Sequence, residues 1–95
     1  MYGTVSRFKL RAGQENALVA QLREFEAAKV AGFQHVYIYR SDADPNQYFM
    51  AVVFAGKDAY WANANSPEQD ARYEKFRELL QADPEWHDGE IIHAQ

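Results

Sequence analysis

Two helices in tandem are predicted by residues 57–80, Lys-Asp-Ala-Tyr-Trp-Ala-Asn-Ala-Asn-Ser-Pro-Glu-Gln-Asp-Ala-Arg-Tyr-Glu-Lys-Phe-Arg-Glu-Leu-Leu. We expect a short helix at residues 58–63 and a longer helix that begins at Ser66. Ser66 is a residue type that caps helices, Pro67 suits the first helical position, and Gln69 stands three residues after the cap. The longer helix then carries an apolar stripe at spacings of three and four residues, made of Tyr73, Phe76, Leu79 and Leu80.

Strands and one further helix surround this pair. Strand-like runs stand at residues 2–10, 33–40, 47–55 and 86–94, and an amphipathic helix at residues 14–30. Pro45 suits the turn between the second and third strands, and Pro84 ends the longer helix. This order of elements is that of the ferredoxin-like split βαβ fold. The sequence therefore predicts a single α+β domain over residues 1–95, a four-stranded antiparallel sheet with the helices on one face.

Composition excludes several classes of function. The chain has 95 residues, a formal net charge of −4 and no basic run, which argues against nucleic acid or an anionic membrane as a partner. It has no cysteine, so disulfides, thiolate nucleophiles and cysteine-ligated zinc sites are excluded. No apolar run approaches the length of a membrane span, and the N-terminus enters a strand-like pattern without a signal peptide. A cytoplasmic protein is the expectation.

The third predicted strand is apolar on both of its faces. One face carries Tyr48, Met50, Val52 and Phe54, and the other carries Phe49, Ala51 and Val53. The second strand is similar, with Val36 and Ile38 opposed to Phe33, Tyr37 and Tyr39. Helices can cover only one face, and burial of each large side chain contributes ~1.5–3 kcal/mol. We therefore expect a homodimer, with a monomer that exposes tyrosines or a different partner as the alternatives.

The element order and the junction Trp61-Ala-Asn63-Ala-Asn65-Ser66-Pro67 together resemble the antibiotic biosynthesis monooxygenase (ABM) family. The family belongs to the dimeric α+β barrel group. Smaller points of likeness are the Gly-Phe pair at residues 32–33 and the aspartate-rich turn at residues 41–46. The resemblance implies two sheets packed face to face in a dimeric α+β barrel, with a pocket between sheet and helices in each subunit. It also implies, for some members, oxygenation of phenols or quinols without metal or flavin, and for some relatives binding and degradation of haem.

The chain departs from the family pattern at two positions in the junction. Many members have a histidine where Asn63 stands and another where Glu68 follows Ser66-Pro67. Haem ligation in the relatives uses a histidine of this region, so we expect no haem, and no other cofactor or metal. His87 and His93 share a face of the last predicted strand but lie ~20 Å apart along it, too far to share a metal. The His87-Asp88 pair is interpreted as an ordinary polar entry to that strand.

Trp61, Asn63 and Tyr73 are the catalytic candidates. Trp61 can stack on a flat substrate, with a core or dimer-contact aromatic as the alternative. Asn63 can hold a substrate oxyanion, with helix capping as the alternative. Tyr73 lies on the apolar stripe, so its ring suits the core and its hydroxyl could be a donor in the pocket. Trp61 and Asn63 are about 200° apart around a helix axis, so we expect the short helix to end or unwind near Asn63 if both face one pocket.

Asn65, Arg72 and His35 are candidates for substrate binding. Asn65, like Asn63, could hold a substrate oxyanion or could cap a helix. Arg72 could attract a phenolate, although an ion pair with Glu68 competes. His35 could act as a base near neutral pH, or be a hydrogen-bonded histidine on a strand face shared with Phe33.

These residues together predict a cofactor-independent monooxygenase of a small phenolic or quinol-type aromatic. The alternative is a non-catalytic, ligand-binding or stress-associated dimeric α+β barrel protein. The predicted junction holds no clear base, and this absence is what keeps the second function open.

Overall fold

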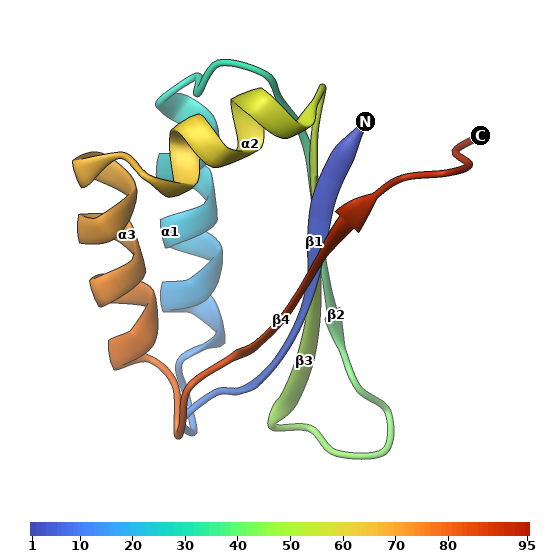
Figure 1. Cartoon of the computed structure of the whole chain (residues 1–95). Coiled ribbons are helices and arrows are strands. Elements are labelled where there is room, and N and C mark those ends of the chain that lie inside the picture. Colours follow the sequence, from blue (N-terminus) through green and yellow to red (C-terminus); the bar gives the residue numbers. More distant parts are fainter.

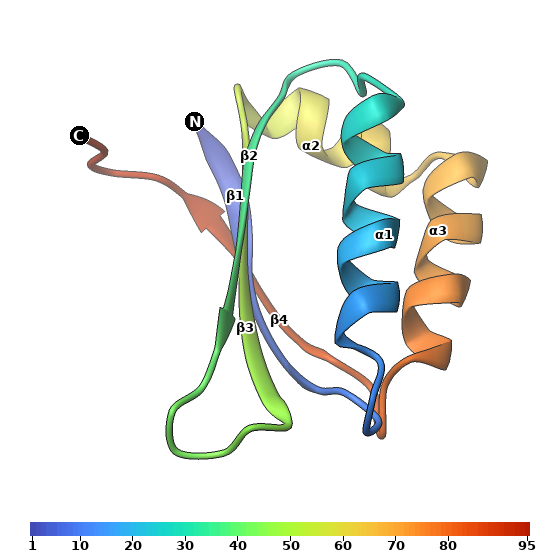
Figure 2. The same cartoon turned by 180° about the vertical axis from the view of Figure 1, so that it is seen from behind.

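Four strands and three helices form two layers in the computed structural model, which describes all 95 residues (Figure 1). The elements follow one another as β1 (Tyr2–Lys9), α1 (Glu15–Ala27), β2 (Phe33–Arg40), β3 (Gln47–Phe54), α2 (Lys57–Ala64), α3 (Pro67–Glu78) and β4 (Glu85–Glu90). The strands are antiparallel to their neighbours, in the order β2-β3-β1-β4. All three helices lie on one face of the sheet, as the view from behind also shows (Figure 2). The predicted ferredoxin-like fold is confirmed.

The last strand, β4, ends at Glu90 and not at residue 94 as predicted. Its partner β1 begins at Tyr2, which pairs with Glu90, and the final backbone bond runs from the Ile91 N–H to the Met1 carbonyl. Residues 91–95 form no strand, so the chain leaves the sheet after this bond. Ile91 and Ile92, which fall inside the predicted strand at residues 86–94, therefore lie outside β4, and Ile92 is 95% exposed.

Capping and one glycine fix the position of α2 and α3. The Ser66 hydroxyl accepts a hydrogen bond from the Gln69 N–H at 3.1 Å, as the capping pattern predicts, and donates one to the Asn63 carbonyl at 2.8 Å. One side chain thus ties the end of α2 to the start of α3. Gly32 has a φ of +80°, and a Cβ there would come within 2.5 Å of the Ala59 Cβ, so the turn before β2 needs glycine to lie against α2.

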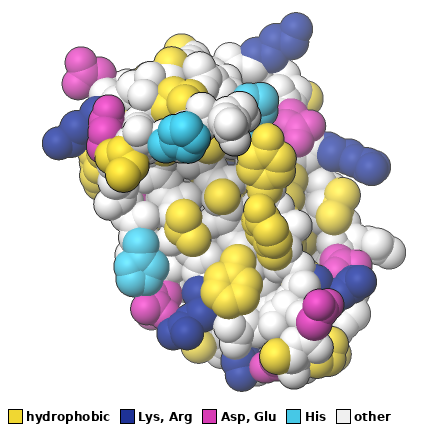
Figure 3. Space-filling view, turned by 90° about the vertical axis from the view of Figure 1, so that its right-hand side faces the viewer, with side chains coloured by type: hydrophobic (Ala, Val, Ile, Leu, Met, Phe, Trp, Pro, Cys, Tyr) yellow, Lys and Arg dark blue, Asp and Glu magenta, His cyan; other side chains and the backbone are white.

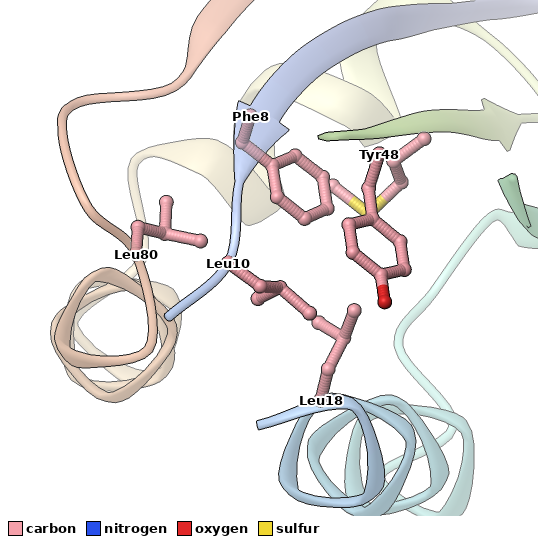
Figure 4. Close-up of a cluster of buried hydrophobic side chains, with 6 residues drawn as sticks. Phe8, Leu10, Leu18, Tyr48 and Leu80 are labelled. Carbon is pink, nitrogen blue, oxygen red and sulfur yellow. The ribbon is translucent and has the colours of Figure 1, made fainter. Parts of the chain in front are cut away.

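The buried core lies between the sheet and the ends of α1 and α3. Its six members meet at one end of the sheet (Figure 4): Phe8, Leu10, Leu18, Tyr48, Met50 and Leu80. The Phe8 and Tyr48 rings stack with their centroids 5.9 Å apart. Leu80, the last residue of the predicted apolar stripe, is fully buried and pairs with Leu10 in an isolated β-bridge. The last residue of the apolar stripe therefore packs the end of α3 against the residue that follows β1.

The sheet face away from the helices is apolar and uncovered. The large hydrophobic side chains exposed there are Val5, Tyr37, Tyr39 and Phe49. Hydrophobic side chains gather at the centre of this face, with charged side chains and histidines around them (Figure 3). Phe33 was predicted on this face but packs on the helix side against Phe25 and Phe54, because a register shift between Phe33 and His35 turns the strand there. No helix of the chain is long and apolar enough to cross a membrane.

Candidate functional site

A cavity of about 710 Å³ lies between the helices and the covered face of the sheet. All four strands and all three helices contribute to its lining of 21 residues, of which 13 are hydrophobic. A volume of this order suits one small organic ligand, and apolar walls with a few polar groups are the usual composition of such sites.

Aromatic rings form two parts of the cavity wall. On one side, edge-to-face contacts with centroid separations from 4.9 to 5.9 Å join Phe25, Phe33, Tyr60 and Trp61, with the buried Phe54 lying between Phe33 and Tyr60 behind the cavity surface. On the other side, Tyr73, Phe76 and Trp86 lie 6.4 Å apart in tilted pairs. Rings held in this way restrict one another's rotamers, so the walls are stiff and offer flat faces to a planar ligand.

Helix α2 presents both Trp61 and Asn63 to the cavity without unwinding. The helix ends at Ala64, with Asn65 as its C-cap, so it does end near Asn63 as expected, and Asn63 itself still lies within the helix. Tyr60 and Ala64 also line the cavity, and they mark the centre of the inward face. Trp61 and Asn63 lie roughly 80° to either side of that centre, so each reaches the cavity from one flank of the helix.

The amide of Asn63 is not committed to the protein. Its backbone carbonyl accepts hydrogen bonds from the Ser66 N–H and hydroxyl, whereas its side chain forms no hydrogen bond and lines the cavity. Trp61 packs edge-to-face on Tyr60 and is 37% exposed, so part of its ring stays open. Trp61 and Asn63 therefore line the same cavity, and each has side-chain atoms there that are free to contact a ligand.

Helix α3 contributes the next two predicted residues, Arg72 and Tyr73, which are both half-buried and line the cavity. The predicted ion pair of Arg72 with Glu68 does not form. The Arg72 guanidinium donates to the Gln69 side-chain oxygen at 3.1 Å and lies 5.3 Å from the centroid of the Phe25 ring. Stacking on the aromatic wall holds this cation over the cavity and draws it away from the outer face of α3.

Two predicted binding residues lie outside the cavity. Asn65 is exposed at the end of α2, where its N–H bonds to the Trp61 carbonyl, the arrangement expected of a helix cap. His35 is exposed on the uncovered face of the sheet, with its ring 6.0 Å from that of Tyr37. The sheet separates His35 from the cavity of its own subunit.

A polar cluster at the sheet side of the cavity was missed by the sequence reasoning. The Tyr60 hydroxyl donates a hydrogen bond to Asp88 Oδ1 at 2.7 Å, and Thr4 lies opposite Asp88 on the neighbouring strand. All three residues line the cavity. Burial, with the adjacent Asp88 carboxylate second, raises the pKa of Tyr60 well above its usual range, so this phenol stays protonated and donates. The Thr4 hydroxyl is buried and has no hydrogen-bond partner.

Strand alternation would have found two of its three residues, Thr4 and Asp88. The interpretation of His87-Asp88 as an ordinary polar strand entry is wrong for Asp88, which points with Trp86 into the cavity while His87 points to the outer face. Period-two alternation in β4 separates these side chains, and Thr4 follows from the same rule in β1. The pairing of β1 with β4 then brings Thr4 and Asp88 together. No three His, Cys, Asp or Glu side chains of the chain lie close enough to hold a metal ion.

Comparison with known proteins places this fold in one family. A model of the antibiotic biosynthesis monooxygenase family matches residues 1–78. Among solved structures, SnoaB, a cofactor-independent oxygenase from Streptomyces nogalater, is similar with a TM-score of 0.81 and 18% identity, over 98% of this chain and 94% of that one. A Chloroflexus aurantiacus protein named for the same monooxygenase family has a TM-score of 0.76 and 23% identity, over 99% and 95% of the two chains.

Rv0793 from Mycobacterium tuberculosis is also similar, with a TM-score of 0.75 and 17% identity, over 98% of this chain and 96% of that one. No curated protein matches the sequence. The likeness to these structures establishes the shared fold, and the family match covers most of the chain. The chain therefore belongs to the antibiotic biosynthesis monooxygenase (ABM) family.

Proposed function

We propose that this protein is a cofactor-independent monooxygenase that acts on a small phenolic or quinol-type aromatic. The observation that carries the proposal is the cavity of about 710 Å³, whose walls are aromatic rings and whose polar groups include an uncommitted amide. Flat walls suit a planar substrate, and a free amide suits an oxyanion. Membership of the ABM family and the similarity to SnoaB, a cofactor-independent oxygenase, support the same reaction class.

The reaction needs little from the protein beyond positioning and deprotonation. A phenolic substrate that loses a proton becomes an electron-rich anion, and that anion can give electrons to dioxygen directly. For an anthrone-type methylene the change is CH2 plus O2 to C=O plus H2O, which balances without an external reductant. The protein would hold the ring, stabilise the developing oxyanion and keep water away from the reacting carbon.

Each lining residue has a role that its position supports. Trp61 offers a partly open ring to stack on the substrate. The Asn63 amide can donate a hydrogen bond to the substrate oxygen, and the Tyr73 hydroxyl can provide a second donor from α3. Arg72, held above Phe25, adds positive charge at the side where a phenolate would lie.

We also propose that the functional unit is a homodimer that packs through the uncovered sheet face. Val5, Tyr37, Tyr39 and Phe49 expose 37–59% of their surface there and stand on the adjacent strands β1, β3 and β2, so they gather on one face and are not scattered. A second copy of the same face would cover it in the geometry of a dimeric α+β barrel. In such a dimer His35 would lie at the interface and would not reach the cavity of its own subunit.

Dioxygen consumption tests the enzymatic proposal directly. Anthrone and simple quinols are incubated with the protein in metal-free buffer, and dioxygen is followed with an electrode. Uptake above the spontaneous rate, with an oxygenated product by mass spectrometry, is the expected result. Ligand binding without any uptake would favour the non-catalytic binding protein, the function that the absence of histidine from the α2–α3 junction keeps in view.

A further inference from the structure

The Thr4–Tyr60–Asp88 cluster has hydrogen-bonding capacity that the protein itself does not use. Tyr60 occupies Oδ1 of Asp88, and the carboxylate forms no other hydrogen bond and no ion pair. The Thr4 hydroxyl, on a residue that is 5% exposed, has no partner at all. Buried polar groups are nearly always paired, so the unpartnered Thr4 hydroxyl is the unusual group here, whereas Asp88 is exposed and its second oxygen is open to a ligand.

The three side chains are held together by the sheet and by α2. Thr4 and Asp88 are direct cross-strand partners in β1 and β4, so their side chains share the cavity face. Tyr60 reaches them from α2, with its ring packed edge-to-face on Tyr2 and Phe54 at 5.2 and 5.5 Å. Its hydroxyl therefore moves little, and it lies near the Thr4 hydroxyl without forming a hydrogen bond to it.

The Tyr60 phenol has one proton and two neighbouring acceptors. In the ligand-free protein this proton is given to the stronger acceptor, the Asp88 carboxylate, and Thr4 is left without a partner. A ligand hydroxyl that donates to the second oxygen of Asp88 would draw on the negative charge of the carboxylate and weaken its hydrogen bond from Tyr60. Tyr60 could then turn its proton to the Thr4 oxygen, and every group in the cluster would be paired.

We propose that the Thr4–Tyr60–Asp88 cluster is the part of the cavity that recognises a hydroxyl group of the ligand. The Asp88 carboxylate accepts the hydrogen bond from the ligand hydroxyl, and Thr4 receives the Tyr60 proton in exchange. The inference rests on the proposed function, since it assumes a small aromatic ligand in this cavity. It adds the chemical group by which the ligand is selected, a free hydroxyl in preference to its ether.

A matched pair of ligands tests this selection without any turnover. 1-Naphthol and 1-methoxynaphthalene are titrated into 15N-labelled protein, and binding is followed by NMR. The two tryptophans of the chain, Trp61 and Trp86, both line the cavity, so their indole N–H signals report binding at this site. Wild-type protein is expected to bind the naphthol roughly tenfold more tightly than the ether, the factor typical of one net hydrogen bond.

Four variants separate the cluster from its surroundings. Asp88→Asn should abolish the preference because an amide nitrogen replaces the free acceptor oxygen, and Thr4→Val should reduce it. Asp58→Asn is the control for charge, because it makes the same change in α2 at a residue outside the cavity. Ser6→Ala is the control for the hydroxyl, because Ser6 is the other buried side chain without a hydrogen-bond partner and it does not line the cavity. Both of these controls should keep the wild-type preference.

The outcomes distinguish this inference from the proposed function. Equal binding of the two compounds by wild type, or an unchanged preference in Asp88→Asn, overturns the hydroxyl site and leaves the oxygenase proposal standing. A preference that depends on Asp88, found in a protein that consumes no dioxygen, supports the hydroxyl site and overturns the oxygenase. If neither compound shifts the indole signals, the cavity does not take flat aromatics and both proposals fall.

Discussion

Thr4→Val should make the ligand-free protein more stable. The Thr4 side chain is 5% exposed and its hydroxyl has no hydrogen-bond partner, so folding removes that hydroxyl from water without compensation. The cost of such a group is about 1–3 kcal/mol, and valine replaces the hydroxyl with a methyl of similar size. We therefore expect a gain of about 1–2 kcal/mol in the free energy of unfolding. For a domain of this size, each kcal/mol raises Tm by ~4–8 °C.

Urea denaturation measures the gain, with wild type and variant at the same protein concentration because association would make stability depend on concentration. The dependence of the unfolding free energy on urea should not change, since the same surface is buried. Thr4→Ser keeps the hydroxyl and loses the methyl, so it should be no more stable than wild type. A Thr4→Val protein that is less stable than wild type by ~1 kcal/mol or more would show that the hydroxyl is paired in the native state, and would refute the reasoning.

Three other predictions follow from the cavity and the sheet. The protein should be a dimer by light scattering at micromolar concentration, and Ala51→Glu at the centre of the uncovered face should split it; a wild-type mass of one 11.0 kDa chain would contradict this. Asn63→Ala should cut oxygenase activity by roughly ten- to a thousandfold with the circular dichroism spectrum unchanged, because one oxyanion donor is lost, and full activity would remove Asn63 from the mechanism. The raised pKa of Tyr60 means that the folded state holds this proton more tightly, so the free energy of unfolding should fall as pH rises above ~10, and fall less steeply in Tyr60→Phe; equal slopes would contradict the shift.

Local sequence signals predicted the elements because they act over a few residues. The Ser66 cap, Pro67 and the apolar stripe ending at Leu80 correctly placed α3, and alternation in β3 correctly indicated two apolar faces. The misplaced features depend on partners distant in sequence. The extent of β4 follows its pairing with β1, whose last pair is Tyr2 with Glu90, and the side on which Phe33 packs is set by a register shift between β2 and β3.

The candidate site divides in the same way. Trp61, Asn63, Arg72 and Tyr73 were found because they cluster around one junction in the sequence, and all four line the cavity. The cluster of Thr4, Tyr60 and Asp88 joins residues near both ends of the chain and exists only after the sheet has formed. Strand alternation could have put Thr4 and Asp88 on the cavity face, whereas their contact with Tyr60 required the packing of α2.

Dioxygen uptake with anthrone in chelator-treated buffer is the decisive test of the proposed oxygenase activity. We expect uptake above the spontaneous rate, one dioxygen consumed per anthrone converted to the quinone, and loss of most of the rate in Asn63→Ala. Uptake that equals the protein-free rate, with anthrone and with the quinols, from a folded protein that binds 1-naphthol, would contradict it.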